Sequence, residues 1–195
     1  FALLPGSRQN EVRSLAETFI QTAQKLHEQF PQAIFLVPLI SRPTRDFFER
    51  ELYRLGASEL PLRIMFGHAH DAIVAADAVL VASGTATLET ALLKRPMVIT
   101  YKVSKLTYRL MWHRKYLPYI GLPNVLAGEF IVPEILQDDA TPENLSQALA
   151  NQVSHRRVTE RLQERFTAMH LQLRQNTAER AAEAIAPYLL RKVRA

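Results

Sequence analysis

The sequence predicts an α/β fold in which helices cover both faces of a parallel sheet. Short segments that are apolar throughout, such as Ala33–Leu39 and Met97–Tyr101, alternate along the chain with longer segments of helical periodicity. Strands that are apolar throughout are buried on both faces, which is typical of doubly wound sheets. Tight turns such as Ser83-Gly84-Thr85 lead from strands into helices. We therefore expect a doubly wound, Rossmann-like parallel sheet.

The elements of the first half can be placed in order. Phe1–Leu4 is a short apolar run, and apolar residues recur at helical spacing from Asn10 to Phe30. This pattern predicts a strand followed by a helix with one buried face. Ser41 can cap a second helix, which we expect to run through Leu55 and stop at Gly56. The other elements are predicted as strands at Ala33–Leu39, Leu62–Phe66, Ala78–Ala82 and Met97–Tyr101, and as helices at His70–Ala75 and Ala86–Leu93.

The second half is predicted to be mainly helical. We expect a helix at Ser104–Arg114, whereas Lys115–Glu134 is rich in proline, glycine and aromatic residues and shows little periodicity. Thr141-Pro142-Glu143 starts another helix, because a capping residue precedes proline at the first helical position. Two further amphipathic helices follow, divided near Asn176. We divide the chain into a Rossmann-like ligand-binding domain, residues 1–150, and C-terminal helices, residues 151–195.

The composition restricts the class of protein. The 195 residues suffice for one domain with a sizeable core, and 48% hydrophobic with 22% charged residues is typical of globular proteins. The absence of cysteine excludes disulfides and thiolate metal sites. The net charge of +5 favours an anionic partner such as a nucleotide, phospholipid or nucleic acid. Because the chain starts without methionine inside a predicted strand, we expect it to be part of a longer protein.

The turn Pro5-Gly6-Ser7-Arg8 is the first candidate site. Ligands of open parallel sheets bind at the carboxyl ends of the strands, and this turn follows the first predicted strand. Gly6 lets the backbone turn, Ser7 and exposed N–H groups can receive an anion, and the planar guanidinium of Arg8 can hold phosphate oxygens. The alternative is a surface turn in which Arg8 caps the following helix.

The second candidate is the segment Ala82–Glu89, which follows a strand and opens a helix. Its N–H groups and the helix dipole favour a diphosphate near Ser83, Gly84 and Thr85. The segment matches neither the Walker loop nor the GxGxxG fingerprint. Glu89 lies one turn into the helix, where its carboxylate could accept hydrogen bonds from both ribose hydroxyls. The alternative for Glu89 is favourable charge placement in the first turn.

The third candidate is Met65-Phe66-Gly67-His68, where a strand passes into a loop. Its backbone groups could meet the edge of a base, with Phe66 as a stacking surface. A buried Phe66 followed by a plain turn at Gly67 is the alternative.

Two weaker patterns also contain polar residues. A metal is not predicted at the loop residues His68, His70 and Asp71, because a third clear ligand is missing there. A phospholipid contact or a solvated basic helix face is predicted for Arg109, Trp112, His113, Arg114, Lys115 and Tyr116.

Together these motifs resemble those of the lipid-A-disaccharide synthases. Their order and spacing carry the resemblance, which covers most of the chain, and the last two helices match only in character. The matching segments are Leu3–Arg8 with Glu11, Ala82–Glu89, Lys102-Val103-Ser104, Leu106-Thr107-Tyr108, Pro118–Gly128, Pro133-Glu134 and Leu136-Gln137.

The resemblance implies one half of a GT-B glycosyltransferase, in which two Rossmann-like domains face a cleft. This chain would be the C-terminal, donor-binding domain, and its last helices would pack on it or on the absent N-terminal domain. The family joins UDP-2,3-diacylglucosamine to 2,3-diacylglucosamine 1-phosphate and releases UDP with inversion at the anomeric carbon. The catalytic base is expected in the N-terminal domain, so the isolated chain is expected to be inactive.

The resemblance also implies where the enzyme works and with what. It implies a peripheral enzyme on the cytoplasmic face of the inner membrane of a Gram-negative bacterium, with no cofactor and no bound metal. The expected partners are the two acylated sugar substrates, the membrane surface and the absent domain. A homo-oligomer is left open, as is the acyl-chain length.

By the same resemblance, Ser83, Gly84 and Thr85 would contact the diphosphate and Glu89 the ribose. Arg8 would stabilise the charge that grows on the leaving UDP, and Asn124 would line the cleft near the sugar or the diphosphate. The remaining expected contacts of the UDP-sugar are Gly6, Ser7 and Phe66. Members of the family often have a basic residue after Leu-Ala-Gly, whereas this chain has Glu129. This departure argues against a phosphate-binding role there.

Two other classes of function compete with this interpretation. Another GT-B enzyme, such as a glycolipid N-acetylglucosaminyltransferase or a UDP-sugar epimerase, would also have a small-residue turn and a ribose-binding glutamate. The segment Tyr101–Gln137 does not match those enzymes. A non-enzymatic nucleotide- or nucleic-acid-binding module would fit the net charge. However, the basic residues form no single stripe and no RNA-binding signature is present, so we expect no nucleic acid.

Overall fold

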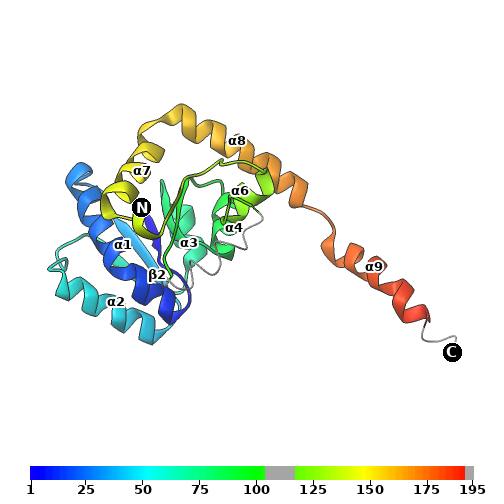
Figure 1. The fold of residues 1–195 in the computed structure, drawn as a ribbon, viewed down its shortest axis with the longest axis horizontal. Helices are drawn as coiled ribbons and strands as arrows, with labels where there is room; N and C mark the ends of the chain where they lie inside the picture. Colours follow the sequence, from blue (N-terminus) through cyan, green and yellow to red (C-terminus); the bar gives the residue numbers. More distant parts are fainter. Residues whose placement is uncertain (104–116, 192–195) are drawn as a thin grey trace.

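A computed structural model describes residues 1–103 and 117–191 of the chain (Figure 1). In these residues a six-stranded sheet has the order β3-β2-β1-β4-β5-β6, and all pairs of neighbouring strands are parallel. This is the strand order of the doubly wound Rossmann fold, so the predicted fold class is confirmed. The strands are β1 (Ala2–Leu4), β2 (Phe35–Leu39), β3 (Leu62–Phe66), β4 (Val79–Ala82), β5 (Met97–Tyr101) and β6 (Glu134–Leu136).

Two hydrophobic cores lie on opposite faces of the sheet. Side chains alternate along β1: Leu3 belongs to the first core, and Ala2 and Leu4 belong to the second. On the first face α1 (Gln9–Gln29) packs between α2 (Arg42–Arg54) and α7 (Pro142–Ser154), as Figure 1 shows. The second core includes buried side chains of α3 (Ala69–Ala75), α4 (Thr85–Leu92) and α8 (Arg156–Leu173). The fold therefore places α1 and α4 on opposite faces of one sheet.

The helix starts predicted from capping residues are confirmed. The Ser41 hydroxyl accepts a hydrogen bond from the backbone N–H of Thr44 at 3.4 Å, and α2 follows it. The Thr141 hydroxyl accepts from the N–H of Asn144 at 3.2 Å at the start of α7. In each case a side-chain oxygen satisfies one of the N–H groups that the first helical turn leaves unpaired.

The segment Lys115–Glu134 is more regular than its sequence suggests. It contains the short helix α6 (Leu122–Ala127), and it leads directly into β6, which was not predicted. A 3₁₀ turn at Gln137–Asp139 follows β6. These elements are too short to show a period, and Pro123 lies in the first turn of α6. The helix predicted for Ser104–Arg114 and the basic cluster around Trp112 lie outside the described residues.

The last two helices differ in their contacts. Side chains of α8, including Phe166, are buried in the second core, whereas α9 (Thr177–Arg191) extends away from the domain (Figure 1). The side chains of α9 up to Leu189 are exposed. The break between the two helices confirms the division predicted near Asn176, and the domain boundary at residue 150 stays a prediction. Among the described helices, none combines the length and apolarity that a membrane span requires.

Candidate functional site

The strand order reverses between β1 and β4, and two predicted site segments meet there. β1 and β4 pair in register, with Leu4 opposite Val81. The turn Gly6-Ser7-Arg8 leaves β1 for α1, and Ser83-Gly84 leaves β4 for α4. The two helices start at the same edge of the sheet, so both direct the positive ends of their dipoles toward that edge. Open α/β sheets generally bind their ligands at such a switch point.

The turn after β1 is organised around a side chain to which sequence reasoning gave no role, Glu11. One of its carboxylate oxygens accepts hydrogen bonds from the backbone N–H groups of Ser7 and Arg8, each at 3.1 Å. Gly6 has a φ of +115°, and a Cβ atom there would lie 2.5 Å from the same oxygen. The N–H groups expected to receive an anion in this turn are therefore already paired within the protein. A glutamate at the third helical position is the sequence signal for such an arrangement.

Arg8 is the N-cap residue of α1, but its guanidinium does not cap the helix. The Arg8 carbonyl accepts from the N–H of Val12 at 3.1 Å, and Glu11 pairs with the Arg8 backbone N–H. The guanidinium has no acceptor atom, and its nearest acidic partner is Glu11, at 3.4 Å from Nη1. The Arg8 side chain is 83% exposed. It is therefore accessible to an anion at the switch point.

The start of α4 presents small residues to solvent. Gly84, the N-cap residue, and Thr85 are exposed, and the Gly84 carbonyl accepts from the Thr87 hydroxyl at 2.7 Å. Ser83 is half-buried, and its hydroxyl donates to the Ile120 carbonyl at 3.3 Å. Glu89 is exposed and lies four residues after Thr85, so the two side chains share one side of the helix.

Asn124 does not line an open cleft, in contrast to the role expected for it. Its side chain is fully buried. The amide nitrogen donates to the Val132 carbonyl and to Glu134, both at 2.9 Å, and the amide oxygen accepts from the N–H groups of Ile131 and Val132. All four hydrogen-bonding positions of the amide are therefore used, three by the loop between α6 and β6 and one by Glu134 of β6.

Glu134 holds the same loop from β6. Its carboxylate accepts from the backbone N–H of Ile120 at 2.9 Å and of Gly121 at 2.8 Å, in addition to Asn124. Gly121 has no room for a side chain, because a Cβ atom would lie 2.3 Å from Cδ1 of Ile99. Since the Ile120 carbonyl also accepts from Ser83, this network connects β6 to the turn before α4. Asn124 and Glu134 thus hold the loop that contacts the turn before α4.

Phe66 lies at the carboxyl end of β3 and is 63% exposed, so the buried alternative is not observed. β2 separates β3 from β1, so β3, with Phe66 at its end, lies about 10 Å from β1. Beyond it, His68 Nδ1 lies 2.9 Å from Asp71, and this hydrogen bond lowers the pKa of Asp71. Within residues 1–103 and 117–191, no group of three or more His, Cys, Asp or Glu side chains could hold a metal ion.

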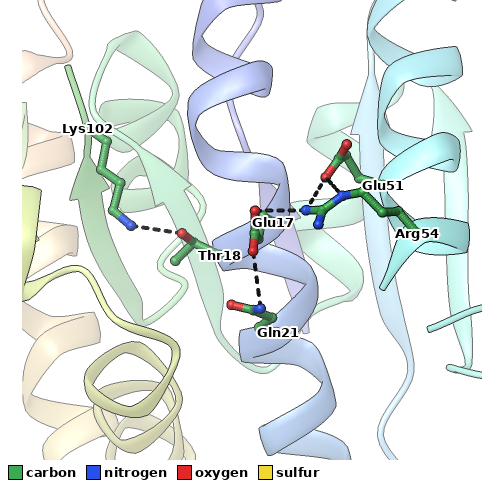
Figure 2. A network of polar contacts seen from close by, with 6 residues as sticks. All are labelled: Glu17, Thr18, Gln21, Glu51, Arg54 and Lys102. Carbon is green, nitrogen blue, oxygen red and sulfur yellow. Dashed lines mark hydrogen bonds and ion pairs between the residues drawn. The ribbon is translucent and has the colours of Figure 1, made fainter. Parts of the chain in front are cut away.

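A lysine that sequence reasoning left without a role follows β5. Lys102 Nζ donates to the Thr18 hydroxyl of α1 at 2.8 Å (Figure 2). Partial burial lowers the pKa of Lys102, and the negative charges of Asp138 and Glu17 oppose this effect. In the same network, the Glu17 carboxylate accepts a hydrogen bond from the guanidinium of Arg54 on α2 at 2.8 Å. These contacts fix the carboxyl end of β5 and the helix α2 against α1.

The position of Glu129, where the resemblance led us to expect a basic residue, has a structural explanation. Its carboxylate pairs with the guanidinium of Arg165 on α8. An acidic residue here joins the loop after α6 to the C-terminal helices.

The strand order defines a Rossmann-like α/β domain, a class in which ligands bind at the carboxyl edge of the sheet. Comparison with known sequences then identifies the particular family. The family described as Lipid-A-disaccharide synthetase matches residues 1–186, and the chain belongs to this family.

Similar curated proteins carry the same name. The chain is 59% identical over 186 residues to a lipid-A-disaccharide synthase of Dechloromonas aromatica and 60% identical over 188 residues to one of Azoarcus sp.. These matches cover 95% and 96% of this chain but 49% and 48% of the relatives. A lipid-A-disaccharide synthase of Neisseria meningitidis is 47% identical over 185 residues. The chain therefore spans about half the length of the curated relatives it matches.

A solved structure shares the fold. The UDP-GlcNAc 2-epimerase of Methanocaldococcus jannaschii, crystallised with UDP-GlcNAc and UDP, superposes with a TM-score of 0.52 over 86% of this chain and 45% of its own. The sequence identity is 15%, so the likeness concerns the fold alone.

Proposed function

We propose that this chain provides the UDP-sugar-binding half of a lipid-A-disaccharide synthase. The enzyme joins UDP-2,3-diacylglucosamine to 2,3-diacylglucosamine 1-phosphate, and UDP leaves with inversion at the anomeric carbon. Membership of the family and identities of 47–60% to curated synthases support the reaction. The structural observation that carries the proposal is the meeting of Arg8 and the start of α4 at the switch point. The other half of the enzyme supplies the second wall of the cleft and the base.

The residues at the switch point suit a nucleoside diphosphate. The N–H groups of Gly84 and Thr85 and the α4 dipole bind the phosphates, and Ser83 fixes the turn. The Glu89 carboxylate accepts hydrogen bonds from the ribose hydroxyls, and the exposed ring of Phe66 can stack on the base. As the bond from the anomeric carbon to the β-phosphate oxygen breaks, negative charge moves onto the phosphate. The Arg8 guanidinium stabilises that charge.

We also propose that the enzyme works at the cytoplasmic face of the inner membrane, where its acylated substrates would lie. The net charge of +5 favours an anionic surface. Arg157 and Arg161 on α8 are exposed beside Phe130, whose ring is 59% exposed. Such a combination of cations and apolar side chains is typical of contact with an anionic membrane surface.

The chain is expected to bind UDP more tightly than ADP or CDP. A site that pairs with the edge of uracil should discriminate among bases, while the contacts with ribose and diphosphate are common to all three ligands. Calorimetry or ligand-observed NMR with the three diphosphates measures the difference. Equal affinities for all three would show that the site does not recognise uracil and would count against the proposal.

Glu89→Ala is expected to weaken ribonucleotide binding specifically. The carboxylate is exposed one turn into α4, and loss of its hydrogen bonds to the ribose should cost about 1–3 kcal/mol. The measurement compares UDP with 2′-deoxy-UDP on both proteins, with Glu164→Ala on the exposed face of α8 as the control. If the variant still prefers UDP by the original margin, Glu89 does not bind the ribose.

A further inference from the structure

The Glu11 carboxylate occupies the place where the turn before α1 would otherwise receive an anion. Its Oε2 atom accepts from the N–H groups of Ser7 and Arg8, and its Oε1 atom faces Arg8 Nη1. The Glu11 side chain is 19% exposed, whereas that of Arg8 is 83% exposed. The space for Oε2 exists because residue 6 is glycine. The Glu11 carboxylate therefore packs against the turn at Gly6, and the Arg8 side chain projects from this turn into solvent.

We propose that Glu11 is a positioning residue for Arg8, an inference that rests on the proposed function. One carboxylate oxygen holds two successive peptide groups, Gly6–Ser7 and Ser7–Arg8, through their N–H groups. It therefore sets the direction in which the Arg8 side chain leaves the turn. The other oxygen faces the guanidinium at 3.4 Å, longer than the usual 2.7–3.2 Å of such a hydrogen bond. The guanidinium is therefore directed but weakly held, and its other N–H groups can bind an anion.

In this arrangement the two turns at the switch point offer the diphosphate different groups. The N–H groups of Ser7 and Arg8 are paired with Glu11, so the turn before α1 offers the diphosphate a guanidinium rather than these two N–H groups. The turn after β4 offers the backbone N–H groups at the start of α4. Because Glu11 is part of the folded protein, Arg8 needs no rearrangement of the turn when the ligand arrives, which is the condition for effective charge stabilisation.

The test is a double-mutant cycle on the 195-residue chain with Arg8→Ala, Glu11→Ala and the double variant. Affinities for UDP and for uridine are measured by ligand-observed NMR. Glu11→Ala should lower the affinity for UDP by about tenfold, as loss of a charge-assisted contact predicts. Its affinity for uridine should stay within about twofold of the parent value, because uridine has no phosphate that Arg8 could bind. The double variant should bind UDP no more weakly than Arg8→Ala alone, because Glu11 acts through Arg8.

Two matched variants separate positioning from folding. Glu11→Gln retains an oxygen for both N–H groups and should lose less UDP affinity than Glu11→Ala. Glu28→Ala removes an exposed glutamate at the other end of α1 and should change neither affinity. If Glu11→Ala does not fold, Glu11→Asp, which shortens the side chain and keeps its charge, replaces it in the cycle with the same expectations.

Equal losses for UDP and uridine, or additive losses in the double variant, would overturn the positioning role. A chain that binds UDP, ADP and CDP alike refutes the uridine-specific function instead, and the coupling between Arg8 and Glu11 is then still measured with any of the three. The failure of one proposal is thus distinguishable from the failure of the other.

Discussion

Replacing Arg8 by alanine in a full-length synthase that carries this sequence is expected to lower kcat by about two to three orders of magnitude. The guanidinium is 83% exposed at the switch point, beside the place where we propose that the β-phosphate gains charge. An interaction that strengthens as the bond to UDP breaks affects kcat more than the donor KM. Arg8→Lys should restore activity only partly, because a point charge lacks the planar fork of arginine.

The control for Arg8 is the melting temperature of the same preparations. The guanidinium makes no hydrogen bond to the backbone of α1, because Glu11 pairs with the Arg8 N–H and the Arg8 carbonyl accepts from the N–H of Val12. Arg8→Ala should therefore melt close to the parent protein. A variant that turns over normally but melts at a lower temperature would assign Arg8 a role in folding and remove it from the reaction.

Asn124→Ala is expected to destabilise the domain by about 2–4 kcal/mol, because buried partners lose their hydrogen bonds. The N–H groups of Ile131 and Val132 lose their acceptor, and the carboxylate of Glu134 loses a donor. For a chain of this length the melting temperature should fall by roughly 5–15 °C, which thermal denaturation followed by circular dichroism can measure.

Asn151→Ala, on an exposed position of α7, is the matched control and should melt like the parent. The same experiment decides between the role seen in the structure and contact with the sugar or diphosphate. If Asn124→Ala left the melting temperature unchanged while the full-length enzyme lost its turnover, Asn124 would have to touch the substrate.

The parts of the fold that sequence predicted are those in which local pattern and burial agree. β3 and β5 have the predicted ends, and Ser41 and Thr141 cap helices as expected, because these features depend on neighbouring residues only. β6 was missed because three residues cannot show a period. The exposure of Phe66 follows from the position of β3 at the edge of the sheet. The apolar residues of a strand do not show whether that strand lies at the edge or in the middle of a sheet.

The same distinction between local and tertiary features applies to the residues of the candidate site. Sequence placed Arg8 and Ser83–Thr85 after strands, and the parallel topology brings such segments to one edge. The burial of Asn124 could not be predicted, because its partners lie seven to ten residues further along in a loop without periodicity. Glu11 was visible as a matching residue, but its meaning depends on the space beside Gly6, which only coordinates reveal.

Because helix α9 is exposed, we expect its backbone amides to exchange with solvent by a different route from those of the domain. Met169 is the last buried side chain before the break at Asn176, and α9 covers no core. An isolated helix of 15 residues is marginal in water, so the amide protons of α9 should exchange with solvent through local fraying. Those of α1, whose apolar face is buried, exchange only when much larger parts of the domain open. In this chain we therefore expect the C-terminal helix to open independently of the sheet.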